Sequence, residues 1–534
     1  MPPLAVSSLR PAWIAPAGWR VASIGGMRVS SHFSATTTGP QQQGVTYRQI
    51  MRSTSLIGGA QAFTVLVTIL RSKLIAVLVG PAGMGVAGLL TSSANLVSGL
   101  TNLGLGTSAV REVAVANSTN RPERISTVVT VLRRLVWGSG ILGLLVMLAL
   151  APKLSQVAFG GTQYTFAFAL LSVTLLLNQL SAGQMVVLQG TRKLQHMVKA
   201  SAAGSAVGLL ATAPLYYVLR VDGIAPAMIV SSAVALLFSW LYSRKVRIVA
   251  LMVSREETIV EGKKMLGMGL VICLNGLVTQ GASYVVRVFI SNTGGVEQVG
   301  LYVAGFAIVS SYVGLIFTAM GTDYYPRLSE VAHDDGLFRT TVNQQVEIAL
   351  LVLTPITSGF LVFSGWVTVL LYSSRFVPAN GMIQWAALGM LLRAVGWATG
   401  MMFLAKNARR VFLWSESIAN AYSVVLNILG YRLFGLTGLG CSFVVFYALY
   451  LAQILILTRV RYSFSFSRGA MRVLSIQGAL AVASFLAGVL LTTPFSYLVG
   501  SVPVVLSGWF TFVELDRRVG LAAVIMELAG RWRW

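Results

Sequence analysis

Four basic residues lie inside long apolar stretches of the chain, where a charge is costly: Arg71, Lys73, Arg287 and Arg393. A basic side chain at the centre of a bilayer costs about 2.5–3.5 kcal/mol on insertion scales, so it usually faces protein or water and often marks a pathway. Such cations attract anionic groups and perform no covalent chemistry alone. The pattern therefore indicates binding rather than bond making.

The depth of each cation decides how easily it could reach the membrane surface. Arg393 lies roughly 16 Å from either end of an expected helix over 382–404, which is too deep for easy snorkelling. Arg71 lies roughly 12 Å from the outer end of its helix. For Lys73 and Arg287, which are closer to the outer boundary, an outward-reaching side chain is an equal alternative. For Arg393 the alternative is a structural ion pair.

Polar side chains precede two of these cations along one helix face, at steps of three or four residues. The first set is Gln61, Thr64, Thr68 and Arg71, and the second is Asn275, Thr279, Ser283 and Arg287. Two such stripes suit a cavity for a polar, anionic ligand. The alternative is hydrogen bonding between helices, which Ser, Thr and Asn commonly provide.

The chain offers little for enzymatic, redox or metal chemistry. Cys273 and Cys441 lie in separate apolar runs, the three histidines are scattered, and no nucleophile constellation, P-loop or dinucleotide fingerprint occurs. We therefore expect no cofactor and no bound metal. Glu416 lies near a helix end, where we expect pairing with a neighbouring group, although it could couple proton or sodium movement.

The composition places these residues in a membrane. Hydrophobic residues make up 55% of the 534 residues and charged residues 10%, against roughly 25% charged in soluble domains. The apolar runs are near the roughly 20 residues that cross a bilayer, which predicts an all-α polytopic protein with about fourteen transmembrane helices. We place them at 57–79, 85–110, 134–152, 163–189, 199–219, 224–243, 266–290, 299–321, 346–371, 382–404, 411–430, 438–458, 473–493 and 497–515.

The distribution of Lys and Arg tests this topology. The even-numbered connections and the tail carry 27 of them, whereas the odd-numbered connections carry only Lys153, Arg220, Arg375 and Arg432. The positive-inside rule therefore predicts that both termini are cytoplasmic. It also accounts for the net charge of +24 without nucleic acid. The predicted external connections are too short to hold a catalytic domain.

The expected organisation is two six-helix lobes followed by two further helices. Residues 1–50 are a basic extension, expected to be disordered or to lie before the true start. The first lobe, with helices 1–6, covers 51–245, and 246–264 is a cytoplasmic linker. The second lobe, with helices 7–12, covers 265–460, and 461–534 contains helices 13 and 14 and a cytoplasmic tail.

A weak internal repeat relates the two lobes. The matching residues are Arg71, Gly80, Gly85 and Gly106 in the first lobe and Arg287, Gly294, Gly300 and Gly321 in the second. Six helices separate the copies, so the lobes have the same orientation. We predict a parallel repeat with a pseudo-twofold axis along the membrane normal.

These features resemble the Wzx-type O-antigen translocases, which belong to the multidrug/oligosaccharidyl-lipid/polysaccharide exporter superfamily. The resemblance covers roughly residues 52–460. It rests on the glycine turn at Gly80–Gly85, on Gly321–Ser329 with its Tyr-Tyr-Pro-Arg-Leu-Ser run, and on Gly389–Lys406, which contains Arg393 and Trp397. The basic N-terminal extension departs from the family pattern.

The resemblance implies a flippase of the bacterial inner membrane. It would move an undecaprenyl-pyrophosphate-linked oligosaccharide, an O-antigen or related repeat unit, from the cytoplasmic to the periplasmic leaflet by alternating access. The expected partners are this lipid, membrane lipids and other polysaccharide-assembly membrane proteins, without nucleic acid. We assign Arg71, Lys73, Arg287, Arg393, Asn275, Thr279, Ser283, Gln61 and Thr68 to substrate binding, and Asp323, Tyr325, Pro326 and Arg327 to a gate or lobe contact.

Three alternatives remain at this point. A cation-coupled drug exporter of the same superfamily would place carboxylates in its cavity. A lipid II flippase would need a similar cationic cavity, and only the Tyr325–Pro326 region favours the O-antigen type. A membrane-embedded glycan polymerase or glycosyltransferase would need acidic catalytic residues and a sizeable external loop.

Overall fold

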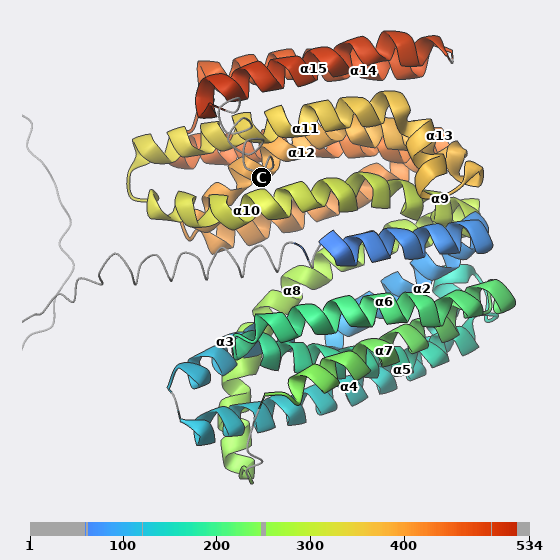
Figure 1. Ribbon diagram of the computed structural model, residues 1–534, viewed down its shortest axis with the longest axis vertical. Helices are drawn as coiled ribbons and strands as arrows, with labels where there is room; N and C mark the ends of the chain where they lie inside the picture. Colours follow the sequence, from blue (N-terminus) through green and yellow to red (C-terminus); the bar gives the residue numbers. More distant parts are fainter. Residues whose placement is uncertain (1–58, 60–61, 120, 247–251, 493, 521–534) are drawn as a thin grey trace, which may run out of the picture. The chain divides into compact units, whose positions relative to one another are not determined.

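The structure is a computed structural model, and it describes residue 59 and residues 62–119, 121–246, 252–492 and 494–520. Regular structure in this part of the chain consists of helices (Figure 1), which confirms the all-α class. The predictions for residues 1–50 and for the tail beyond residue 520 lie outside the described residues.

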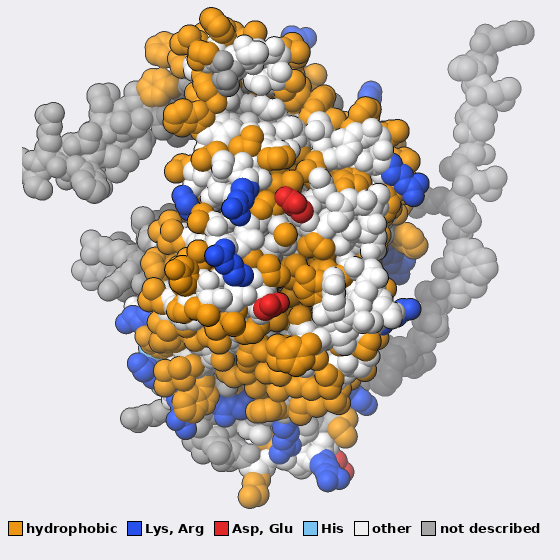
Figure 2. Space-filling model, turned by 90° about the vertical axis from the view of Figure 1, so that its right-hand side faces the viewer, with side chains coloured by type: hydrophobic (Ala, Val, Ile, Leu, Met, Phe, Trp, Pro, Cys, Tyr) orange, Lys and Arg blue, Asp and Glu red, His pale blue; other side chains and the backbone are white. Residues whose placement is uncertain are grey.

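The outer surface is that of a membrane protein. Nine helices in the described ranges are long and apolar enough to cross a membrane. Large apolar side chains are exposed on several of them, for example Leu210 at 72% and Trp509 at 67%, and hydrophobic side chains cover much of the face shown in Figure 2. A water-soluble protein rarely exposes such large contiguous apolar areas. The chain is a multi-pass membrane protein, and the number of fourteen spans stays a prediction.

The first bundle, as we call it, is formed by the helices between residue 62 and Ser243. They are a helix over 62–78, α2 (Gly80–Thr101), α3 (Leu105–Ser118), α4 (Pro122–Phe159), α5 (Thr165–Gly190), α6 (Leu194–Leu219) and α7 (Ile224–Ser243). Helix α5 packs against α4 and α7, and α6 packs against α7 (Figure 1). A Cβ on Gly183 of α5 would lie 2.9 Å from the Val136 side chain of α4, so the missing side chain permits this close packing.

The second bundle runs from Val296 to Tyr462. Its members are α9 (Val296–Phe306), the π-helix η1 (Ala307–Tyr312), α10 (Val313–Glu330), α11 (Asp335–Leu371), the 3₁₀ helix η2 (Ser374–Ala379), α12 (Asn380–Ala405) and α13 (Arg409–Tyr462). Helix α12 packs between α11 and α13.

Helix α13 contains two of the predicted spans, 411–430 and 438–458, and it folds back on itself. Gly435 interrupts the helix with φ 59° and ψ −138°, a backbone conformation that glycine adopts without the steric cost of a Cβ. Beyond it, the Ser442 hydroxyl donates to the Leu426 carbonyl at 2.7 Å, and the Tyr450 hydroxyl donates to Glu416 at 2.7 Å. The two halves therefore lie against each other as a hairpin.

Helix α8 (Arg255–Gly294) connects the two bundles. Near its start the Glu261 carboxylate accepts two hydrogen bonds from Arg124 of α4, at 2.9 and 3.0 Å, and one from Lys264, at 3.0 Å. Burial would raise the pKa of the Glu261 carboxyl, but the two cations hold it below its usual value. Near its other end Phe289 stacks edge to face on Tyr431 of α13. One helix thus anchors to both bundles.

The bundles also meet where α2 crosses α9, at two glycines that the repeat had paired. A Cβ on Gly85 would lie 1.9 Å from the Val296 carbonyl oxygen, and a Cβ on Gly300 would lie 1.8 Å from the Pro81 carbonyl oxygen. Each glycine contacts the residue four positions before the other. The crossing is therefore reciprocal, and any side chain at either position would collide with backbone.

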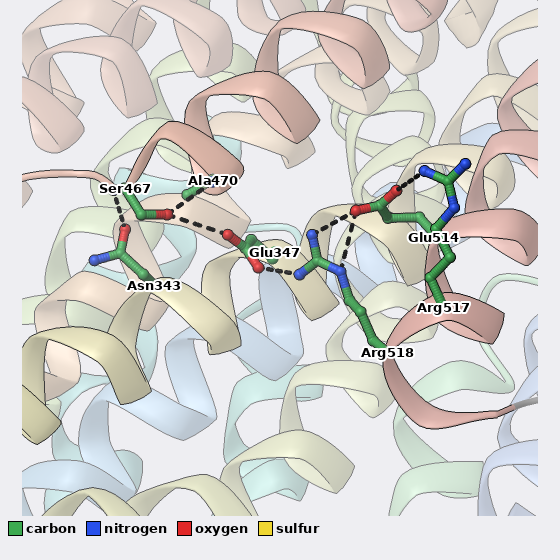
Figure 3. A network of polar contacts seen from close by, with 7 residues as sticks. All are labelled: Asn343, Glu347, Ser467, Ala470, Glu514, Arg517 and Arg518. Carbon is green, nitrogen blue, oxygen red and sulfur yellow. Dashed lines mark hydrogen bonds and ion pairs between the residues drawn. The ribbon is translucent and has the colours of Figure 1, made fainter.

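Helices α14 (Arg468–Leu490) and α15 (Phe495–Val519) pair with each other and pack on α11. A polar network joins all three, as Figure 3 shows. Arg518 of α15 forms an ion pair with Glu347 of α11 and another, at 2.7 Å, with Glu514. On the other side of the network, the Ser467 hydroxyl donates to Glu347 at 3.2 Å. These contacts hold the C-terminal hairpin on the second bundle.

Candidate functional site

A cavity of about 870 Å³ lies between the helix over 62–78 and the second bundle, and Arg393 lines it. Its volume falls within the roughly 300–1,000 Å³ of ordinary ligand pockets. The lining residues are Val65 of the helix over 62–78, Gly314, Phe317, Thr318, Gly321, Thr322 and Tyr325 of α10, and Arg393, Trp397, Met401 and Leu404 of α12. We call it the Arg393 cavity.

The Arg393 guanidinium is held by aromatic faces rather than by an acid. Its central carbon lies 5.4 Å from the Phe317 ring centroid and 5.8 Å from that of Tyr447. Its Nη1 contacts the Met390 sulfur at 3.8 Å. Within the described ranges no carboxylate lies within ion-pair distance of it. Aromatic faces stabilise a cation without neutralising it, so the charge is available to an anionic ligand.

Trp397 forms an aromatic wall one turn along α12 from Arg393. Its ring centroid lies 5.2 Å from that of Phe317 and 5.8 Å from that of Tyr324. The buried Tyr324 hydroxyl donates to the Ala398 carbonyl at 2.8 Å, which fixes this tyrosine against α12. The cavity therefore combines one cation, apolar rings and the Thr318 and Thr322 side chains.

Helix α10 supplies most of the cavity wall, and the segment that leads into it is irregular. The π-helix η1 (Ala307–Tyr312) interrupts the run from α9 to α10, directly ahead of Gly314 and Phe317. In the first bundle the equivalent helix is broken between α2 and α3, where Leu103 and Gly104 both have positive φ. Such irregularities interrupt regular helix packing and are frequent at functional sites.

A second cavity, of about 280 Å³, lies beside the first, between α8 and both halves of α13. Thr279 and Ser283 of the predicted polar stripe line it, together with Glu416, Asn420 and Tyr447. Tyr447 also contacts Arg393, so one ring borders the second cavity and meets the cation of the first. The expected pairing of Glu416 at a helix end is with the Tyr450 hydroxyl.

Arg71 lies in neither of these cavities. Its Nη2 donates to the Ser231 hydroxyl of α7 at 2.5 Å, and it lines a cavity of about 190 Å³ formed by first-bundle helices. Thr68 lines the same cavity and donates to the Thr64 carbonyl at 2.8 Å. The structure thus separates Arg71 from Arg393.

Lys73 and Arg287 bridge elements and line none of the three cavities described above. The Lys73 ammonium donates to the Leu370 carbonyl of α11 at 2.6 Å, a contact between the bundles. Arg287 donates to the Gly88 carbonyl of α2 at 3.5 Å. Gln61 and the side chain of Asn275 lie outside the described residues, so their assignment stays a prediction.

The four residues assigned to a gate lie in α10. Tyr325 lines the Arg393 cavity, whereas Arg327 approaches Asp323 at 3.9 Å and donates to Gln345 of α11 at 3.3 Å. Pro326 lies inside the helix and is exposed. Both contacts of Arg327 lie within the second bundle, and the gate assignment stays a prediction.

Comparison with known proteins identifies the family of the chain. The model of a family described as polysaccharide biosynthesis protein matches residues 74–381, more than half of the chain. The chain belongs to this family. The lipid III flippases of Escherichia coli (strain K12) and Shigella flexneri are each 23% identical to this chain over 359 residues. The match covers 65% of this chain and 83% of each relative.

Solved structures place its fold among transporters of the MOP superfamily. An inward-facing multidrug resistance transporter of the MATE family matches with a TM-score of 0.65 and 17% identity, over 75% of this chain and 94% of that one. Lipid II flippase MurJ in an inward closed conformation matches with a TM-score of 0.63 and 11% identity, over 86% and 98%. The chain therefore shares its fold with transporters of this exporter superfamily.

Sequence analysis missed one residue that lines a polar cavity. Glu416 was not assigned to a site, yet it shares a cavity with two stripe residues, Thr279 and Ser283. A signal was present, because Glu416, Asn420 and Asn427 recur at helical spacing. No group of three or more His, Cys, Asp or Glu that could hold a metal ion occurs in the described part of the chain.

Proposed function

We propose that this protein flips an undecaprenyl-pyrophosphate-linked oligosaccharide, such as an O-antigen repeat unit, from the cytoplasmic to the periplasmic leaflet of a bacterial inner membrane. The proposal rests on Arg393, a cation without a carboxylate partner among the described residues, in a cavity of about 870 Å³ between the bundles. The diphosphate would pair with Arg393 and the sugars would lie against Trp397 and Tyr325. The prenyl chain would stay in lipid.

The position of the cavity supports alternating access. The close contacts between the bundles, at Gly85 and Gly300 and between Lys73 and Leu370, lie at the helix ends that the charge pattern predicts to be periplasmic. The cavity reaches Leu404, near the predicted cytoplasmic end of α12. In the proposed cycle the ligand enters from the cytoplasmic side. The glycine crossing then separates while that side closes.

The second cavity, which Glu416 lines, supports coupling of transport to a proton or sodium gradient. Glu416 has no basic partner in the described ranges and lies among the hydroxyls and amides of Thr279, Ser283 and Asn420. A carboxylate in such a position can take up a proton or a small cation. Because Tyr447 lines this cavity and also contacts Arg393, charge uptake at Glu416 would change the field at the ligand site.

The test is transbilayer movement of a fluorescent undecaprenyl-pyrophosphate oligosaccharide in proteoliposomes. The intact protein is compared with Arg393→Gln and with Arg472→Gln, which removes an exposed cation of α14. We expect movement by the intact protein and by Arg472→Gln, and its loss in Arg393→Gln.

Two outcomes would favour an alternative function, and a third would reject the site. Preference for lipid II over the oligosaccharide lipid would favour the lipid II flippase. Export of cationic drugs without lipid movement would favour the drug exporter, although a central cation disfavours cationic cargo. Unimpaired movement in Arg393→Gln would reject the site and leave the function standing.

A further inference from the structure

The Arg71 guanidinium of the first bundle has little compensation for its charge. Among the described residues its hydrogen bond is to a neutral hydroxyl, that of Ser231, at 2.5 Å. Its Nε is inaccessible to solvent and has no hydrogen-bond partner. In the part of the chain that the structure describes, no carboxylate forms an ion pair with it. A charge withdrawn from water needs a counter-charge or strong hydrogen bonds.

The space beside Arg71 is lined with hydroxyl groups. The cavity of about 190 Å³ is bordered by Thr68, Ser181, Ser201, Ser205 and Ser231, which belong to the helix over 62–78 and to α5, α6 and α7. The Ser201 and Ser205 side chains form no hydrogen bond with the described residues, so their hydroxyls can donate into the cavity. A guanidinium among hydroxyl donors is a surrounding that favours an anion.

The size of this cavity limits the ligand. Its volume of about 190 Å³ is below the roughly 300–1,000 Å³ of pockets for drug-sized ligands, so it cannot hold a diphosphate with its sugars. All of its lining residues belong to the first bundle, whereas the Arg393 cavity lies between the bundles. The ligand must therefore be small and distinct from the transported lipid.

We propose that the first bundle binds a small monovalent anion, such as chloride, between the Arg71 guanidinium and the hydroxyls of α6. The anion supplies the negative charge that the surrounding protein lacks and accepts from groups that otherwise have no partner. Arg287 provides a contrast, because its Nε is also buried without a partner but it lines none of the described hydroxyl cavities. The anion site does not depend on the proposed function.

The experiment is thermal unfolding of the full-length protein in detergent, titrated with sodium chloride at constant ionic strength against sodium gluconate. An anion that binds only the folded state raises the unfolding temperature with its concentration. We expect a saturable rise of about 2 °C or more in chloride and a similar rise in bromide. Gluconate is a weakly coordinating carboxylate with a long hydroxylated chain and should give none. Phosphate is tested as the divalent competitor.

Three variants make the result specific. In Arg71→Gln the chloride-dependent rise should disappear, whereas Arg287→Gln, which removes another buried guanidinium, should retain it. Ser205→Leu leaves Arg71 in place and fills the cavity with an apolar side chain, so the rise should also disappear there. This variant decides the question if Arg71→Gln does not fold.

Three results would overturn the proposal. They are an equal rise in gluconate, a rise that survives both Arg71→Gln and Ser205→Leu, and no saturable rise in the intact protein. The last would mean that water alone solvates Arg71.

Discussion

Arg71 and Arg393 are the same residue type, each deep in an apolar helix, yet their surroundings differ. Arg71 lies within one bundle, in a cavity of about 190 Å³ lined with hydroxyls. Arg393 lies between the bundles, in a cavity of about 870 Å³ beside the Phe317 and Trp397 rings. Depth in the membrane indicates that a cation matters, but its neighbours and the open volume decide what it can bind.

The largest expected effect tests this comparison directly. Arg393→Gln should weaken binding of a pyrophosphate-linked oligosaccharide about 10- to 100-fold, because a hydrogen bond to a charged group contributes about 1.5–3 kcal/mol. Arg71→Gln should change it less than about threefold. The measurement is equilibrium binding of the fluorescent lipid in detergent. Equal losses would show that both arginines contact the same ligand.

The glycine crossing between the bundles gives the next effect. Gly85→Ala and Gly300→Ala should each destabilise the described state by about 1–3 kcal/mol, because the added Cβ collides with backbone. Thermal unfolding checks this, with Gly138→Ala as a control, since a Cβ there meets nothing within 4 Å. A tolerated alanine at either position would mean that the bundles do not meet closely at α2 and α9.

A variant of Glu416 tests the role of the second cavity separately from that of the Arg393 cavity. Glu416→Gln should lower gradient-driven transport about tenfold, equivalent to about 1.4 kcal/mol, while binding of the lipid at Arg393 persists. Transport in proteoliposomes with and without a proton or sodium gradient measures it, and the exposed Glu330→Gln is the control. A normal response to the gradient in Glu416→Gln would contradict the coupling role.

The smallest effect concerns the attachment of α8 to the first bundle. Because Arg124 and Lys264 lower the folded-state pKa of Glu261, its carboxylate stabilises the fold above the unfolded value of 4.5. This contribution is lost as the pH falls through the lowered folded value. Glu261→Gln should cost less than about 1 kcal/mol near neutral pH, since both cations are partly exposed.

The pH dependence of unfolding checks this prediction. The loss of stability between intact protein and Glu261→Gln should shrink below about pH 4. A difference that stays constant down to pH 3 would mean that the ion pairs with Glu261 do not form in solution.

Several features could be predicted because they depend on local pattern. The all-α membrane class follows from apolar runs, and the equivalence of Gly85 and Gly300 follows from equal spacing in the repeat. Only the structure showed that these two glycines meet. The environment of Arg71 could not be predicted, because Ser205 and Ser231 are more than 130 residues away along the chain. The cavity that Glu416 shares with Thr279 and Ser283 could not be predicted, because these two residues lie on another helix.

The sequence by itself determined that this is a multi-pass helical membrane protein with basic residues inside its apolar helices, since hydrophobicity and charge are properties of each residue and its near neighbours. The tertiary structure alone decided that the cations do not share one cavity. Helix packing sets which faces meet, and a rotation of one helix would move Arg71 from the bundle interior toward the space between the bundles. That packing depends on many contacts between distant segments.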